Sequence, residues 1–353
     1  MSTNKPFLLK PASKDNLWGG SRPNDDFNLG LESDPLAEAW VCSTHPDGIS
    51  SLVSGNGECE SLTSMLAVHP EWLGSHALTL TCGKSELPIL IKLIDAKKDL
   101  SVQVHPDDEY ASTHENGSLG KTELWYVLDA KKDSSLVYVF NRDVSAEVVR
   151  KSIQYGLIKN MLNTVPVKRN DLFMVHPGTV HAIGAGCLIV ETQESSNITY
   201  RLYDYDRVDK NGQKRELHID KALDVVNLRS SLLPRQPMRC LKYRNGCATE
   251  LLGRCKYFQV ERLLLNTEIN RNLVDYRTED NSFHALLVVD GCGSISEATT
   301  SGDTGEGGYN VERLAFNFFK GDCIFVPAES IPLKLHGKAQ ILDVIVNDIS
   351  IFT

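Results

Sequence analysis

The chain has 353 residues, of which 41% are hydrophobic and 24% are charged, and its formal net charge is −9. These values are typical of a globular protein with a sizeable core, and the length fits one to three domains. The excess of acidic residues, with no basic cluster longer than two residues, argues against nucleic acid as a partner. The longest apolar runs are far shorter than the ~20 residues that span a bilayer, which argues against a membrane segment.

The cysteines indicate the compartment. There are nine of them, no CxxC pair occurs, and the N-terminal stretch MSTNKPFLLK has no signal-peptide pattern. We therefore expect a cytoplasmic protein in which most thiols are small core residues.

Short apolar runs bounded by Gly, Pro, Asn and Asp dominate the chain, for example at 87–94, 136–140, 188–190 and 284–289. This spacing predicts a mainly β protein, a sandwich or barrel, and not a series of βαβ units.

Helices interrupt the predicted strands at three places, 62–72, 145–163 and 219–228. The second is the clearest, because Ser145 can cap its N-terminus. Apolar residues then recur every fourth position and form a stripe: Val149, Ile153, Leu157 and Met161.

The first polar pattern in a predicted strand is SVQVHPDD, residues 101–108. Alternate residues of a strand share a face, so Ser101, Gln103 and His105 point to one side and two valines to the other. Unpaired polar groups in an apolar interior cost about 1–3 kcal/mol each, so the three need partners. A hydrogen-bonded core histidine remains an alternative to a metal ligand.

Two later stretches supply possible partners. In GKTELWYVL, residues 120–128, Lys121 and Glu123 share one face of a predicted strand, although an exposed Lys/Glu pair at a sheet edge would give the same pattern. In VHPGTVHAI, residues 175–183, His176 lies at a predicted turn and His181 begins the next strand.

Two imidazoles, one carboxylate and one amide oxygen form a mixed donor set: Gln103, His105, Glu123 and His181. This set suits zinc and could accept iron, manganese or cobalt. Because a structural zinc site more often uses cysteine, N/O donors with an exchangeable water indicate Lewis-acid catalysis.

The stretch VETQESSNITYRLYDYDR, residues 190–207, contains Glu191 and Arg201 on consecutive predicted strands joined by a polar turn. The turn could bring both to the His181 side, where an arginine fork can bind carboxylate or phosphate. A structural ion pair between Glu191 and Arg201 fits the spacing equally well. Asp204, Asp206 and Arg207 are expected to fix the loop.

A short internal echo indicates duplication. NDLFMVHPG, residues 170–178, is similar to GDCIFVPA, residues 321–328, but the second copy has no ligand-capable side chain where the first reaches His181. The breaker-rich stretch 230–237 is the expected boundary between two β domains, and the Gly-rich stretch 294–309 is expected to be a loop.

Several long motifs in the right order make the chain resemble class I mannose-6-phosphate isomerase in its short bacterial form. They are PASKDNLWGGSRP, EAWVCSTHPDG, LSVQVHPDDEYASTHENGSLGKTELWYVLDA, HPGTVHAIGAG and SSNITYRLYDYDR, within residues 6–228. The resemblance implies a fold of two cupin (jelly-roll) β-sandwich domains with a helical insertion. We expect residues 1–235 to form the catalytic, metal-binding domain and residues 236–353 a degenerate cupin domain without metal ligands.

The resemblance also implies the reaction and the site. The reaction is the reversible conversion of mannose 6-phosphate to fructose 6-phosphate through a cis-enediol, with one Zn²⁺ per chain. The zinc ligands carry over to Gln103, His105, Glu123 and His181. Lys121, Glu191 and Arg201 lie in the substrate pocket as catalytic residues, Ser101 is a phosphate contact, and Trp18 lies near the mouth. Glu191, Lys121 and a zinc-bound hydroxide all remain candidates for the base.

Other functions fit parts of the pattern. An iron dioxygenase would share the histidines and the carboxylate, but Gln103 would fill a position that oxygen needs. A metal- or sugar-binding protein without turnover would have little use for the costly charges of Lys121, Glu191 and Arg201. A different sugar phosphate could fit a slightly altered pocket. The sequence leaves the oligomeric state open.

Overall fold

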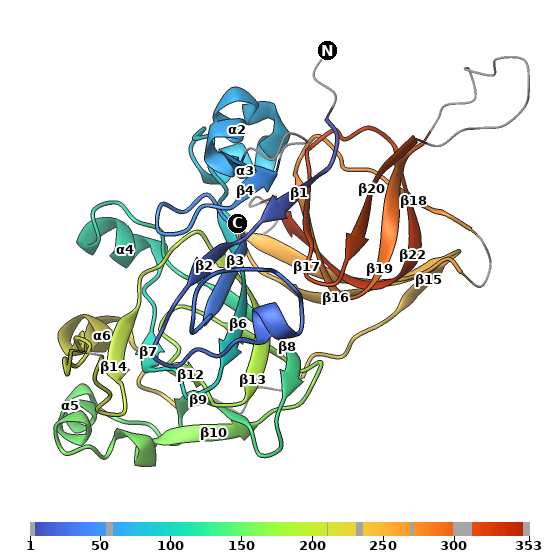
Figure 1. The fold of residues 1–353 in the computed structure, drawn as a ribbon. Helices are drawn as coiled ribbons and strands as arrows, with labels where there is room; N and C mark the ends of the chain where they lie inside the picture. Colours follow the sequence, from blue (N-terminus) through green and yellow to red (C-terminus); the bar gives the residue numbers. More distant parts are fainter. Residues whose placement is uncertain are drawn as a thin grey trace, which may run out of the picture.

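The computed structural model describes residues 4–53, 59–209, 211–230, 236–268, 272–298 and 313–348. Its strands form three antiparallel sheets, with short helices at the periphery (Figure 1). The predicted mainly β architecture with helical insertions is confirmed. Within the described parts of the chain, no helix combines the length and the apolarity needed to cross a bilayer.

The six-stranded sheet forms one wall of the N-terminal half. Its strands, in spatial order, are β11 (Leu172–Val175), β8 (Glu123–Ala130), β13 (Cys187–Glu194), β6 (Ile89–Ala96), β3 (Glu38–Cys42) and β2 (Ala12–Lys14). Every residue of β6 and β13 is buried, because both faces of this sheet are covered. A central strand buried on both faces reads as a nearly continuous apolar run, which is how the sequence predicts it.

The five-stranded sheet lies opposite. Its order is β10 (Leu162–Pro166), β9 (Ser135–Phe140), β12 (His181–Ile183), β7 (Val102–Val104) and β14 (Tyr200–Tyr203). Val102 and Val104 are fully buried in a core cluster that also contains residues of α5 (Ala146–Gln154) and α6 (Ile219–Val225). The helices therefore cover the outer face of this sheet, and the polar residues of β7 face inward as predicted.

The third sheet joins both ends of the chain. The N-terminal strands β1 (Phe7–Lys10), β4 (Ser51–Val53) and β5 (Cys59–Ser61) extend a sheet of C-terminal strands. The C-terminal strands are β15 (Lys242–Arg244), β16 (Cys247–Arg254), β17 (Phe258–Asn266), β18 (Val274–Tyr276), β19 (His284–Glu297), β20 (Arg313–Phe319), β21 (Cys323–Val326) and β22 (Leu333–Val346). The junction is the antiparallel pair of β1 with β21, in which Leu8 lies opposite Ile324. The two segments of the internal echo, 170–178 and 321–328, are both strands, β11 and β21.

Two predicted boundaries fall partly outside the described residues. The expected domain boundary at 230–237 includes residues 231–235, which are not described, so the division at 235 stays a prediction. The expected loop at 294–309 begins later than predicted, because β19 continues to Glu297. Residues 299–309 of that loop are not described.

The predicted helix at 145–163 is too long. Ser145 accepts a hydrogen bond from the N–H of Val148, as expected for an N-cap, but α5 ends at Gln154. Gly156 follows with a positive φ of 69°, a conformation that ends helices, and Leu157 is 52% exposed. The four-residue spacing of apolar residues therefore extends beyond the helix by coincidence. The chain after Leu157 forms a 3₁₀ turn (Ile158–Met161) and then β10.

The remaining helices are short. They are α1 (Arg22–Asp25), α2 (Leu62–Val68), a 3₁₀ turn (Pro70–Leu73), α3 (Ser75–Leu80) and α4 (Asp108–His114). Helices are thus confirmed near 62–72 and 219–228, although each is shorter than predicted.

Candidate metal centre and active site

The six-stranded sheet presents a row of four residues side by side, one from each of four neighbouring strands. Trp40 of β3 lies opposite Lys92 of β6, Lys92 lies opposite Glu191 of β13, and Glu191 lies opposite Trp125 of β8. Antiparallel pairing places the side chains of such a row on one face. The row therefore combines a buried cation and a buried anion between two indole rings.

The five-stranded sheet presents a second row. Tyr138 of β9 lies opposite His181 of β12, His181 lies opposite Gln103 of β7, and Gln103 lies opposite Arg201 of β14. The Trp125 and His181 rings meet edge to face with centroids 5.3 Å apart. The two rows therefore face each other across the space between the sheets.

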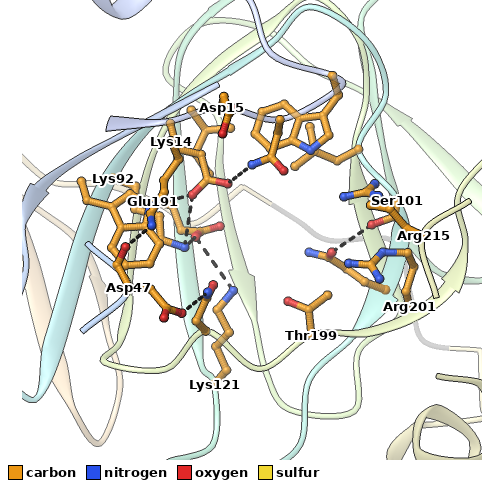
Figure 2. A pocket seen from close by; sticks show the side chains of 18 residues that line it. Lys14, Asp15, Asp47, Lys92, Ser101, Lys121, Glu191, Thr199, Arg201 and Arg215 are labelled. Atoms are coloured by element: carbon orange, nitrogen blue, oxygen red, sulfur yellow. Dashed lines mark hydrogen bonds and ion pairs between the residues drawn. The ribbon is translucent and has the colours of Figure 1, made fainter. Parts of the chain in front are cut away.

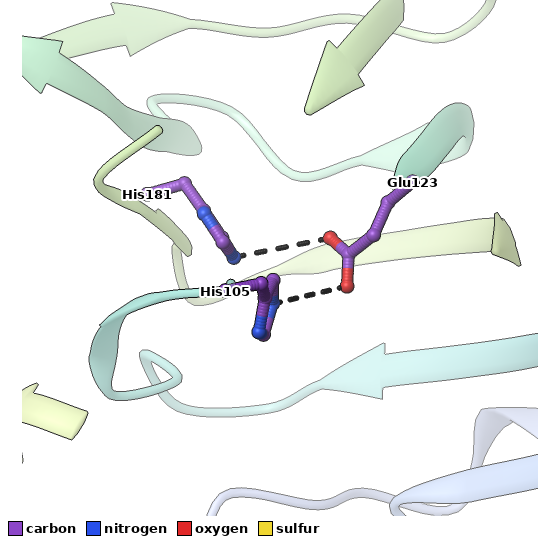
Figure 3. A group of neighbouring side chains, drawn as sticks. All are labelled: His105, Glu123 and His181. Carbon is purple, nitrogen blue, oxygen red and sulfur yellow. Dashed lines mark ion pairs between the residues drawn. The ribbon is translucent and has the colours of Figure 1, made fainter. Parts of the chain in front are cut away.

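Three potential metal ligands meet at the centre of this space. One ligand atom each from His105, Glu123 and His181 lie within 4.8 Å of one another (Figure 3). His105 Nε2 is 3.2 Å from Glu123 Oε1, and His181 Nε2 is 3.8 Å from Glu123 Oε2. The Nδ1 atoms bond to main-chain carbonyls, that of Ile198 at 2.8 Å for His105 and that of Thr179 at 2.9 Å for His181. This bond fixes the tautomer that leaves Nε2 free to bind a metal.

The protonation states also fit metal binding. Burial, assisted by the charge of Lys121, lowers the pKa of His105 to about 4, and burial lowers the pKa of His181. Burial alone would raise the pKa of Glu123, but the charge of Lys121 and the interactions with His105 and His181 together outweigh it and hold that pKa well below its usual range. Two neutral imidazoles and one carboxylate are the forms that coordinate a divalent cation.

Two further observations favour a cation at this point. The Glu123 carboxylate is fully buried. Lys121 Nζ pairs with Oε1 at 2.5 Å, whereas Oε2 has no hydrogen-bond partner among the described residues. Gln103 Nε2 lies 3.3 Å from His181 Nε2, and its Oε1 accepts a bond from Ser101. Rotation of the amide by 180° exchanges its oxygen and nitrogen and directs the oxygen at the same point as the imidazoles.

A cavity of about 440 Å³ opens beside these ligands (Figure 2). Its walls combine residues of both rows with side chains from neighbouring strands and loops. The lining residues are Lys14, Asp15, Asn16, Trp18, Glu38, Trp40, Asp47, Lys92, Ile94, Leu100, Ser101, Gln103, Lys121, Glu191, Asn197, Thr199, Arg201 and Arg215. The lining is polar and charged, which suits a polyhydroxylated anion better than an apolar ligand.

One end of the cavity contains the buried acid and its two lysines. Glu191 Oε1 lies 3.1 Å from Lys92 Nζ and 4.0 Å from Lys121 Nζ, and Trp125 Nε1 donates to Glu191 Oε2 at 2.9 Å. Burial would lower the pKa of Lys121, but the charges of Glu123 and Glu191 raise it overall, so Lys121 is an ammonium. The alternative of a Glu191–Arg201 ion pair is wrong, because Lys92 is the partner of Glu191.

The other end contains two arginines, in the view of Figure 2 across the cavity from Glu191. Arg201 Nη1 donates to the carbonyl of Glu216 at 2.8 Å, its main-chain N–H donates to His218 Nδ1 at 3.2 Å, and its Nε is buried without a partner among the described residues. Burial, together with the nearby charge of Arg215, lowers the pKa of Arg201. Two crowded guanidinium groups favour an anion between them.

Asp204 orients the second arginine. Arg215 Nε and Nη2 donate to its two oxygens at 2.8 and 2.5 Å, and Arg207 bonds the same carboxylate. The burial of Asp204 would raise its pKa, but the arginine bonds lower it. Asp204 and Arg207 thus fix the loop as predicted, whereas Asp206 forms an exposed ion pair with Lys214 at 2.6 Å. Arg215 keeps a guanidinium edge for the cavity.

The structure brings the residues predicted for the site together around one cavity. Gln103, Lys121, Glu191 and Arg201 line it, as do Ser101 and Trp18, and His105, Glu123 and His181 lie against it. Trp18 is only 3% exposed, so it forms part of the wall. His176 is exposed on its turn, as expected.

Sequence reasoning missed Lys92, Trp40 and Arg215. Lys92 carried a usable signal, because it is the one charged residue within the apolar stretch 87–94 and a lysine in a buried strand needs a partner. Arg215 carried none, because it lies in a polar segment whose return to the cavity depends on the bond to Asp204.

Comparison with known proteins gives consistent matches. A family model described as the catalytic domain of phosphomannose isomerase type I matches residues 7–144. Mannose-6-phosphate isomerase ManA of Bacillus subtilis is 35% identical over 338 residues, which cover 96% of this chain and 98% of that protein.

Solved structures agree. The crystal structure of mannose 6-phosphate isomerase from Bacillus subtilis superposes with a TM-score of 0.81 at 29% identity, over 96% of this chain and 99% of that one. A zinc-bound mannose 6-phosphate isomerase superposes with a TM-score of 0.69 over 98% of this chain and all of that one, and its 14% identity indicates a common fold only. The predicted cupin-type fold is thus confirmed, and the chain belongs to the type I mannose-6-phosphate isomerase family of enzymes.

Proposed function

We propose that the protein catalyses the reversible interconversion of mannose 6-phosphate and fructose 6-phosphate through a cis-enediol, and that one zinc ion per chain is required. The observation that carries the proposal is the buried Glu123 carboxylate at the edge of the charged cavity. It faces the Nε2 atoms of His105 and His181, and its Oε2 has no hydrogen-bond partner among the described residues.

The proposed ligands are Gln103, His105, Glu123 and His181. Two nitrogen and two oxygen donors suit zinc, and the zinc-bound relative with the same fold supports this choice. When bound, the metal would act as a Lewis acid that polarises the substrate carbonyl and offsets the negative charge of the enediolate.

The phosphate of the substrate is proposed to lie between Ser101, Arg201 and Arg215. A dianion accepts charge-assisted bonds from both guanidiniums and from the serine hydroxyl. Binding would supply a partner for the buried Nε of Arg201 and would relieve the repulsion between the arginines. It would also fix the sugar chain in one direction along the cavity.

The carbonyl end then lies near Glu191 and Lys121. We assign the proton transfers to this pair, whose Oε1 and Nζ atoms are 4.0 Å apart. Glu191 can take the proton next to the carbonyl, and the Lys121 ammonium can donate to the oxygen that becomes an enediol hydroxyl. Lys92 and the Trp125 indole hold both oxygens of Glu191 in place.

The assignment of the two domains and their roles is also a proposal. Residues 1–235 would form the catalytic domain, and residues 236–353 a second cupin domain that contributes no metal ligand. The support is that all four proposed ligands lie on β7, β8 and β12 or directly beside them.

The test is turnover of mannose 6-phosphate before and after removal of metal by a chelator, followed by addition of zinc. We expect turnover to disappear and to return with zinc. Turnover that persists after metal analysis shows the protein to be metal-free would contradict the metal requirement. A zinc-loaded protein that turns over a different sugar phosphate, but not mannose 6-phosphate, would contradict the substrate.

A further inference from the structure

The segment that leads into β8 is held by its backbone at three successive positions. The N–H of Gly120 donates to Asp108 Oδ1 at 3.0 Å, that of Lys121 to the carbonyl of Pro106 at 3.0 Å, and that of Thr122 to Glu194 Oε1 at 2.7 Å. Residues 120–122 carry the Lys121 side chain and lead directly to Glu123. These bonds therefore determine where the lysine and the carboxylate lie.

Two of the three acceptors are carboxyl groups that face each other. Burial, together with the charge of Asp108, raises the pKa of Glu194 to about 8, so Glu194 is mostly protonated at neutral pH. The burial of Asp108 would raise its pKa, but a hydrogen bond from Tyr257 and the N–H of Gly120 lower it. The pair therefore holds one negative charge, on Asp108, which needs donors.

The principal donor comes from the C-terminal strands. Tyr257, in the turn between β16 and β17, donates its hydroxyl to Asp108 Oδ2 at 2.5 Å. Lys256 also approaches that oxygen, but at 3.5 Å and with a side chain that is 48% exposed, so its contribution is small.

The turn that carries Tyr257 is rigid and packed against β8. Asn347 Nδ2 donates to the carbonyl of Cys255 at 2.8 Å, and the N–H of Cys255 donates to the carbonyl of Phe258 at 2.9 Å. Phe258 is fully buried in the same core cluster as Leu124 of β8. The hydroxyl of Tyr257 is therefore fixed relative to the strand that begins at Glu123.

We propose that Tyr257 is a positioning residue of the active site, through which the C-terminal strands hold Lys121 and Glu123 by way of Asp108 and the 120–122 segment. This inference deepens the proposed function and rests on it for the roles of Lys121 and Glu123. It gives the C-terminal strands a part in catalysis although, among the described residues, none beyond Arg215 lines the cavity.

Tyr257→Phe tests the proposal, because it removes one hydroxyl and leaves the ring. We expect the affinity for zinc, measured by titration of the metal-free protein, to fall severalfold. This is less than the roughly 10- to 100-fold that loss of a direct hydrogen-bond partner of a metal ligand costs, because Tyr257 acts through Asp108 and residues 120–122. We expect kcat to fall by a similar factor and KM for mannose 6-phosphate to change less. The matched control is Tyr243→Phe, whose side chain lies on the neighbouring strand β15 and is 80% exposed, and it should match the parent protein.

A double-mutant cycle separates positioning from general destabilisation. If the hydroxyl acts through Asp108, Asp108→Ala, which removes the acceptor, combined with Tyr257→Phe should lower zinc affinity no further than Asp108→Ala alone. Effects that multiply, or a Tyr257→Phe protein equal to the Tyr243→Phe control, would overturn the inference. Zinc titration needs no substrate, so this result is independent of whether the parent protein turns over mannose 6-phosphate.

Discussion

Arg215→Gln tests the assignment of the phosphate end of the cavity. Gln cannot supply the positive charge that the free edge of the Arg215 guanidinium presents to the cavity, but Asp204 stays partnered through Arg207, so the loop should persist. One hydrogen bond to a charged group contributes about 1.5–3 kcal/mol, which corresponds to roughly 10- to 150-fold in binding. We therefore expect KM for mannose 6-phosphate to rise by about that factor, with a smaller change in kcat, because the phosphate does not react.

The assay is steady-state turnover of mannose 6-phosphate, with inorganic phosphate as a competitive inhibitor in the same experiment. Arg207→Gln is the matched control, because Arg207 bonds the same Asp204 carboxylate but does not line the cavity. The inhibition constant of phosphate should rise in Arg215→Gln and not in Arg207→Gln. Equal KM values and equal inhibition constants in the two variants would refute the assignment.

Three further changes have defined outcomes. The pKa of Glu194 is about 8 in the folded protein and near 4.5 in the unfolded protein, so the parent protein should lose a few kcal/mol of unfolding free energy as pH rises from about 4.5 to 8. Glu194→Gln, which can still accept the bond from Thr122, should not show this loss. A difference in melting temperature between parent and Glu194→Gln that is the same at pH 5 and pH 9 would contradict this. Trp125→Phe removes the N–H that bonds Glu191, so kcat should fall about tenfold with zinc content unchanged, and an unaltered kcat would show that this bond does not orient the acid. Ser145→Ala removes a helix cap far from the cavity and should cost about 1 kcal/mol of unfolding free energy by chemical denaturation while turnover stays constant; loss of turnover would contradict the peripheral role of α5.

The strands and the residues of the candidate metal site are the features that local pattern could predict. Val102 and Val104 alternate with polar residues, and an alternation of two determines which side chains share a face. The pairing of His181 with Gln103 then needed only that β7 and β12 be neighbours. The family resemblance supplied that long-range information, which periodicity alone could not.

Features that depend on one dihedral angle or on distant contacts were not predictable in this way. The stripe of α5 continued past Ile153 in the sequence, but the chain turned at Gly156, whose positive φ no hydrophobic period reveals. The contact of Tyr257 with Asp108 joins residues 149 positions apart, and although Asp108 ends the stretch SVQVHPDD, no pattern marks Tyr257 as its partner. Such contacts depend on how the sheets pack against one another. The sequence shows this packing only as apolar residues.

The measurement that tests the central claim most directly is titration of the metal-free protein with zinc while turnover of mannose 6-phosphate is followed. We expect turnover to rise in proportion to added zinc and to stop rising at one zinc per chain, and we expect Glu123→Gln to show neither tight binding nor turnover. Full turnover in the metal-free protein, or in Glu123→Gln, would contradict a catalytic metal held by Gln103, His105, Glu123 and His181.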